Sequence, residues 1–170
     1  MGIIECILDR IFEHKILTTG CDGQDDQNPY LKRWYIRKRR GAQRGFQLYL
    51  HKIIRPDHDR ALHDHPWWFW ALVLWGGYVE EVMENGGQIT RRHIGWLRLN
   101  RKRAEGIHRI DSLDGGGPTW TLFLTGPLER DWGFWESSKE VPDVGFDPPL
   151  WGWTHWRAFM SRPGRCKEKE

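Results

Sequence analysis

Two histidines separated by a single residue, His63 and His65, have the type and spacing in this sequence that most directly predict chemistry. In a β-strand, residues i and i+2 project from the same face, with Cα atoms about 6.6 Å apart. Two imidazoles at that spacing can converge on one metal ion, as they do in zinc sites with bonds of about 2.0–2.1 Å. Asp64 then projects from the opposite face, so we expect it to support the histidines or the strand from behind rather than bind the ion.

A catalytic metal site usually needs a third protein ligand. His108 is the best candidate, because it lies in a short strand-like segment, GIHRI, that an antiparallel barrel can fold back onto the first pair. His93 is the competitor, but it lies close to the predicted end of a strand. We therefore predict that His63, His65 and His108 hold a divalent metal ion, iron(II) in first place and zinc, manganese or nickel as alternatives.

Residues that would line a substrate pocket follow from strand parity. In the segment TWTLFLTG, Thr119 and Thr121 share one face, and in FQLYLHK, Tyr49 and His51 share another. An arginine would suit a substrate carboxylate, and Arg98 is preferred over Arg109, which points away from His108 by parity. The predicted pocket residues are Tyr49, His51, Trp67, Arg98, Thr119 and Thr121.

The elements that must position these residues are mostly short strands. Apolar residues at three- and four-residue spacings from Ile3 to Phe12 predict an amphipathic helix that ends near Thr18–Gly20, followed by a loop over 21–29. Glycine-rich turns at 85–87 and 114–118 predict two hairpins. Gly152 to Met160 predicts one or two helical turns, and the residues after Arg162 predict a frayed tail. The predicted strands cover 46–55, 67–75, 78–83, 88–92, 107–113, 119–125 and 131–135.

Many short strands at regular spacing without intervening helices indicate an all-β barrel or sandwich. The length of 170 residues suits one domain, and no internal repeat is present. We expect a single domain over 1–170, with an N-terminal helix and loop over 1–30, the barrel over 44–136 and a short C-terminal extension over 150–170.

The order of these motifs resembles the cupin superfamily, in which an H-x-H pair is followed by a glutamate, a closing glycine and, after a hairpin, a lone histidine. Here His63 and His65 are followed by Gly76-Gly77 and then by Gly106-Ile107-His108, but Phe69 or Trp70 stands in the place of the glutamate. The resemblance implies a double-stranded β-helix, or jelly-roll, barrel. More narrowly, the pattern LHDHPW…GGY…HRI…TWTLFLTGP…WGFW resembles small cupin-like proteins of bacteria and phages.

Composition restricts the classes of partner. A formal net charge of +3 argues against a dedicated nucleic-acid protein, and three scattered cysteines argue against a disulfide framework. The longest apolar run, Trp67 to Trp75, is about half of what a membrane helix needs, and charges interrupt the N-terminal segment. We therefore expect a cytoplasmic location and no membrane contact. Because cupins often form dimers, a homodimer is a further expectation.

Three functions fit these features. The leading one is a three-histidine, non-haem iron(II) oxygenase or dioxygenase that acts on a small molecule inside an aromatic pocket. The second is a redox-neutral cupin enzyme, an isomerase, epimerase or lyase, in which a divalent metal polarises a carbonyl group. The third is a non-catalytic binding or regulatory module for an anionic ligand or nucleic acid, suggested by the basic residues over 32–44 and 91–103.

Overall fold

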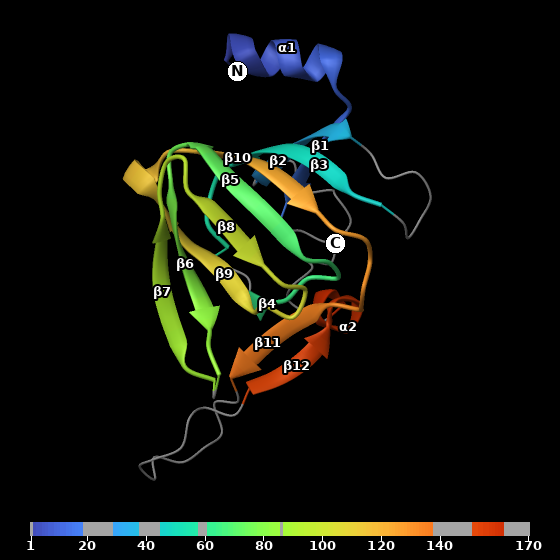
Figure 1. Cartoon of the computed structure of the whole chain (residues 1–170), viewed down its shortest axis with the longest axis vertical. Helices are drawn as coiled ribbons and strands as arrows, with labels where there is room; N and C mark the ends of the chain where they lie inside the picture. Colours follow the sequence, from blue (N-terminus) through green and yellow to red (C-terminus); the bar gives the residue numbers. More distant parts are fainter. Residues whose placement is uncertain are drawn as a thin grey trace, which may run out of the picture.

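Two six-stranded antiparallel sheets form a jelly-roll barrel (Figure 1). The computed structural model describes residues 2–18, 29–37, 45–57, 61–85, 87–137 and 151–161. The first sheet has the order β1 (His14–Thr18), β2 (Pro29–Arg37), β3 (Gln47–Ile53), β10 (Thr119–Thr125), β5 (Phe69–Trp75) and β8 (Leu99–Lys102). The second has the order β12 (Trp151–His155), β11 (Gly133–Ser137), β4 (Leu62–His63), β9 (His108–Leu113), β6 (Tyr78–Met83) and β7 (Ile89–Ile94). The predicted all-β class and barrel are confirmed.

Alternation along each strand separates the interior of the barrel from its outer surface. In β10, Thr119, Thr121 and Thr125 are buried, while Leu122 and Leu124 take the other face by the two-residue period of a strand. In the register of the sheet, Thr121 lies opposite His51 of β3 and Val73 of β5. His51 of β3 is buried opposite Thr121 and therefore also points into the barrel interior.

The N-terminal helix is shorter than predicted. Helix α1 covers Ile3–Ile11, and β1 begins at His14 and pairs with β2. The helical spacing of apolar residues ends at Phe12, and the following residues gain a full ladder of backbone hydrogen bonds by joining the edge of the sheet. Because β1, β2 and β12 all belong to the two sheets, the barrel strands extend beyond the expected range of 44–136.

Helix α1 docks on the barrel through its acidic residues. Asp9 accepts hydrogen bonds of 2.8 Å from both Lys32 and the indole of Trp34, and Glu5 forms an ion pair with Lys52. The isoleucines of the helix remain exposed, with Ile3 at 82%. Figure 1 accordingly shows α1 lying outside the barrel, beyond β1 and β2.

One of the two predicted hairpins is confirmed and the other is wrong. β6 and β7 pair directly, from Met83 opposite Ile89 to Tyr78 opposite Ile94. β9 and β10 follow each other in the chain but belong to different sheets, since β9 pairs with β4 and β6 whereas β10 pairs with β3 and β5. A short 3-10 turn, Asp114–Gly116, carries the chain across, with positive φ angles of 61° at Gly115 and 66° at Gly116 that glycine adopts without strain.

The C-terminal part combines a strand and a helix. β12 pairs with β11, and α2 (Trp156–Met160) follows it, so the helical turns predicted over 152–160 begin only after His155. The loop predicted over 21–29 lies almost wholly outside the described residues, and the tail predicted after Arg162 lies outside them entirely. Within the part of the chain that the structure describes, neither helix has the length and apolar character needed to cross a membrane.

Candidate metal centre

The three histidines named as ligands lie together at the junction of three strands. His63 in β4 is paired directly with His108 in β9 on one side and with Phe134 in β11 on the other. One ring nitrogen from each of His63, His65 and His108 lies within 4.8 Å of the other two. Their closeness follows in part from register, because the pairing of β4 with β9 sets His63 opposite His108. His65 lies two residues beyond the end of β4, where its backbone nitrogen donates to the carbonyl of Ala104 at 3.0 Å.

The geometry of this cluster fits a metal ion. The Nε2 atoms of His65 and His108 are 2.9 Å apart, and two nitrogens bound to one ion at about 2.1 Å and a right angle would be separated by about 3.0 Å. The same distance also fits a hydrogen bond between two neutral imidazoles. Burial, followed by the charges of His108 and His63, holds the pKa of His65 well below its usual range, so its ring is neutral at pH 7, the form that binds metals.

A buried carboxylate that the sequence interpretation missed orients His108. Glu80 of β6 is completely buried, and its Oε2 lies 3.2 Å from Nδ1 of His108 and accepts a bond of 3.0 Å from Asn100. Its other oxygen lies 2.9 Å from the ammonium of Lys102. A carboxylate on one ring nitrogen directs the other nitrogen of a histidine toward a metal. The sequence did contain a sign of this role: in the segment YVEEVM, Glu80 alternates with its neighbours so that it shares one strand face with Tyr78 and Val82, the face that is buried.

Asp64 points away from the three histidines. Its carboxylate accepts hydrogen bonds from the backbone of Gly133 at 2.7 Å and from Arg130 at 2.9 Å. The indoles of Trp135 and Trp153 each donate to it at 3.2 Å. Asp64 therefore ties β11 and β12 to the strand that carries the histidines, and a direct effect on the ligands stays a prediction.

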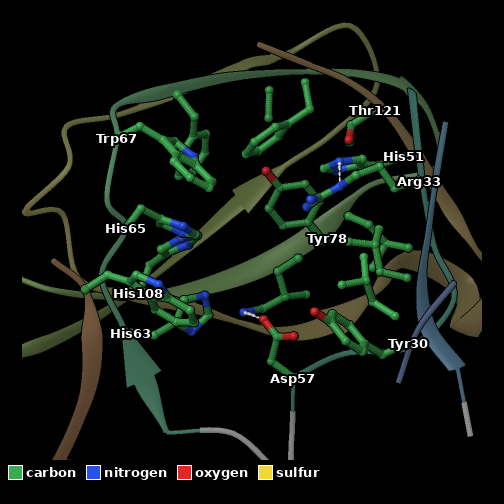
Figure 2. A pocket seen from close by; sticks show the side chains of 18 of the residues that line it. Tyr30, Arg33, His51, Asp57, His63, His65, Trp67, Tyr78, His108 and Thr121 are labelled. Carbon is green, nitrogen blue, oxygen red and sulfur yellow. Dashed lines mark hydrogen bonds between the residues drawn. The ribbon is translucent and has the colours of Figure 1, made fainter. Parts of the chain in front are cut away.

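The cluster opens into a cavity of about 280 Å³ inside the barrel. Of the six predicted pocket residues, His51, Trp67 and Thr121 line it (Figure 2). The others lie elsewhere: Tyr49 is buried behind His51 with ring centroids 5.5 Å apart, Arg98 is exposed, and Thr119 donates to the carbonyl of Gly77. The cavity also has lining residues that were not anticipated: Tyr30, Arg33, Asp57, Tyr78 and Trp132.

An aromatic ring fills the place where the cupin pattern has a glutamate. Phe69 is buried, and its ring centroid lies 5.0 Å from that of His65 and 5.5 Å from that of His108. Trp70 faces outward and is 43% exposed. Phe69 is therefore the residue at this position that faces the cluster, and it offers an apolar wall instead of a fourth ligand.

Several of the basic residues that suggested a nucleic-acid surface are paired with acids. Lys32 and Lys102 are buried against Asp9 and Glu80, and at the surface Arg91 and Arg92 pair with Asp111 and Glu84. The competing histidine, His93, is exposed and lies 2.9 Å from Asp114. Lys38, Arg39, Arg40, Arg44 and His58 lie outside the described residues.

Comparisons with known proteins identify a similar fold at low similarity. No protein-family model matches the chain, and no curated protein matches it. A structure of oxalate decarboxylase that describes its substrate binding mode and reaction specificity switch matches with a TM-score of 0.49 and 11% identity, over 70% of this chain and 28% of the other. Oxalate decarboxylase from Bacillus subtilis at pH 4.6 matches with a TM-score of 0.48 and 12% identity, again over 70% and 28%. The chain thus spans less than a third of these proteins, and values this low carry no information about its activity.

Proposed function

We propose that this protein is a metal-dependent cupin enzyme that acts on a small molecule, with iron(II) held by His63, His65 and His108 in an oxygenase reaction. The observation that supports it is the convergence of three histidine nitrogens within 4.8 Å at the wall of a cavity inside the barrel. A metal ion on three neutral imidazoles supplies a Lewis acid with positions left open for substrate and, as iron(II), the redox capacity that an oxygenase needs.

The protein's own residues prepare this site. Glu80 holds the ring of His108 by its Nδ1 atom, which leaves Nε2 directed at His65. The rings of Phe69 and Phe123, whose centroids are 4.7 Å apart, form an apolar wall of the cavity. Thr121 and Tyr78 supply hydroxyl groups at the same cavity.

Metal content is the first test. The full-length chain should be purified, loaded with iron(II) or zinc under anaerobic conditions and compared with the variants H63A, H65A and H108A. We expect each variant to bind metal at least about 100-fold more weakly, since losing even an outer partner of a ligand costs about 10–100-fold. H93A is the matched control, because His93 is exposed and bonded to Asp114, and it should bind metal like the unmodified protein.

Thermal unfolding supplies an independent reading of the same site. A ligand at about 100 times its Kd stabilises the folded state by about 2.7 kcal/mol. Added metal should therefore raise the Tm of the unmodified protein and of H93A but not that of H65A. Metal content and Tm that stay unchanged in all three cluster variants would refute the assignment of the ligands.

Oxygen consumption tests the reaction class. The iron-loaded protein should consume O₂ in the presence of at least one member of a panel of thiols, catechols and organic acids, and H65A should not. Turnover of a panel member without O₂ uptake would refute the oxygenase and establish the redox-neutral alternative. Binding without any turnover would refute both and leave the binding module.

A further inference from the structure

A guanidinium group lies across the cavity from the three histidines. Arg33 comes from β2, and its Nε donates a hydrogen bond of 2.9 Å to Nε2 of His51. Its guanidinium carbon lies 4.5 Å from the centre of the Tyr49 ring. Figure 2 shows Arg33 and His51 at one end of the cavity and His63, His65 and His108 at the other.

The surroundings of Arg33 fix its orientation. His51 accepts through Nε2, which requires a neutral ring, and burial together with the charge of Arg33 holds the pKa of His51 well below its usual range. Because Nε is used in this bond, the outer edge of the guanidinium, with its two terminal nitrogens, is the edge that remains for a ligand. That edge matches the two oxygens of a carboxylate.

No carboxylate of the described residues neutralises Arg33, whereas the two buried lysines, Lys32 and Lys102, each have one. Lys102 has Glu80 within 2.9 Å, and Lys32, beneath α1, has Asp9 within 2.8 Å. Asp57 also lines the cavity, but its carboxylate accepts from the backbone nitrogen of Ile110 at 3.1 Å. A half-buried cation without a counter-ion is costly to maintain, and a bound anion would remove that cost.

We infer that Arg33 binds the carboxylate of the substrate and that the substrate is therefore a small organic acid; this inference rests on the proposed function of the cavity. The guanidinium of Arg33 offers a single planar pair of donors, and the surrounding walls, formed by residues such as Leu31, Ile53 and Phe123, are apolar. This combination suits a monoanion with an apolar body. A phosphate dianion would need more donors and would lie in the same cavity as Asp57. Arg33 thus takes the role that the sequence had suggested for Arg98.

Benzoate and its uncharged analogue benzamide test this inference directly. Each is titrated calorimetrically into the full-length chain, once as purified and once after a chelator has removed any metal, so that a carboxylate–metal bond cannot contribute. We expect benzoate to bind in both preparations and benzamide to bind at least about tenfold more weakly, because it cannot form the charged pair. Equal binding of the two compounds overturns the inference, and so does tighter binding of inorganic phosphate than of benzoate.

Variants locate the binding to Arg33. R33Q should weaken benzoate at least about tenfold, R33K should weaken it less because it keeps the charge but loses the fork, and R98Q, at an exposed arginine, should leave it unchanged. Unchanged benzoate binding by folded R33Q overturns the inference; if R33Q does not fold, the comparison of benzoate with benzamide decides alone. Metal content of R33Q should equal that of the unmodified protein. The two proposals can fail separately. If the metal proposal fails, no metal is found in the purified protein, whereas the role of Arg33 is still decided by benzoate binding to the chelator-treated protein.

Discussion

Replacing Glu80 by glutamine should destabilise the fold far more than the same change at its neighbour Glu81. Glu80 is completely buried and faces the ammonium of Lys102, whose side chain is only 6% exposed. Glu81 lies on the other face of β6 and pairs with Arg109 at 2.7 Å in a pair that reaches solvent. The two variants therefore make the same chemical change on opposite faces of one strand.

The structure supplies a magnitude for the loss at Glu80. Burial alone would raise the pKa of its carboxyl group, but the hydrogen bond and charge of His108, followed by the charge of Lys102, outweigh burial and lower that pKa from 4.5 to about 2. Removing one partner of a buried ion pair costs about 3–5 kcal/mol, whereas a surface pair contributes about 1 kcal/mol or less.

The sign of the pH dependence sets the conditions of the assay. Because the folded-state pKa of Glu80 lies below the unfolded value, its contribution is complete above pH 4.5 and is lost as the pH falls toward 2. Urea unfolding at neutral pH, with a chelator present to remove any contribution from metal, should therefore show the full loss for E80Q and a loss of about 1 kcal/mol or less for E81Q.

A double variant separates the lost ion pair from a general disturbance of the strand. E80Q leaves Lys102 buried without a counter-ion, so adding K102M should restore part of the stability. The reasoning is refuted if E80Q loses no more than E81Q, or if the double variant is no more stable than E80Q.

Two further predictions concern residues beside the cavity and behind the histidines. Since burial and Arg33 lower the pKa of His51 below the unfolded value of 6.5, the unfolded chain takes up a proton that the folded chain refuses as the pH falls below 6.5. The protein should lose up to about 1.4 kcal/mol per pH unit there, and H51Q should lose correspondingly less in urea unfolding; equal slopes would contradict this. D64A removes the acceptor of the Gly133 backbone and of three side chains, so it should cost about 3 kcal/mol or more while metal content stays unchanged. Loss of metal at unchanged stability would instead show that Asp64 acts on the ligands.

The all-β class could be predicted because it depends on local pattern. Alternation within segments such as TWTLFLT and the glycine-rich turns is sufficient to indicate strands, and the i, i+2 relation places His63 and His65 on one face in any strand. The partners of each strand are not a local property. The sequence around 114–118 has the composition of a hairpin turn, yet β9 and β10 join different sheets because each finds its ladder with strands distant in the chain.

The cavity residues that were missed share a physical cause. Arg33 belongs to a run of basic residues that, read along the chain, resembles a solvated face. Its neighbours Lys32 and Trp34 turn out to be buried beneath α1 on the outer surface of the sheet, which sends Arg33 to the interior by parity. That outcome depends on where α1 docks, and the docking depends on an ion pair and a hydrogen bond between residues 23 or more positions apart.

The charges at inward positions of the barrel connect the two proposals. An interior position tolerates a charged group when a partner neutralises it, and Glu80 with Lys102 meets that condition within the protein. Among the described residues, the guanidinium of Arg33 at one end of the cavity has no such partner, and at the other end one nitrogen from each of three imidazoles lies within 4.8 Å of the others. Under the two proposals, a cation would complete the histidine end and an anion the arginine end. A small organic acid whose carboxylate meets Arg33 would extend toward the histidines, so that the group to be transformed lies beside the metal while the charged group is held away from it.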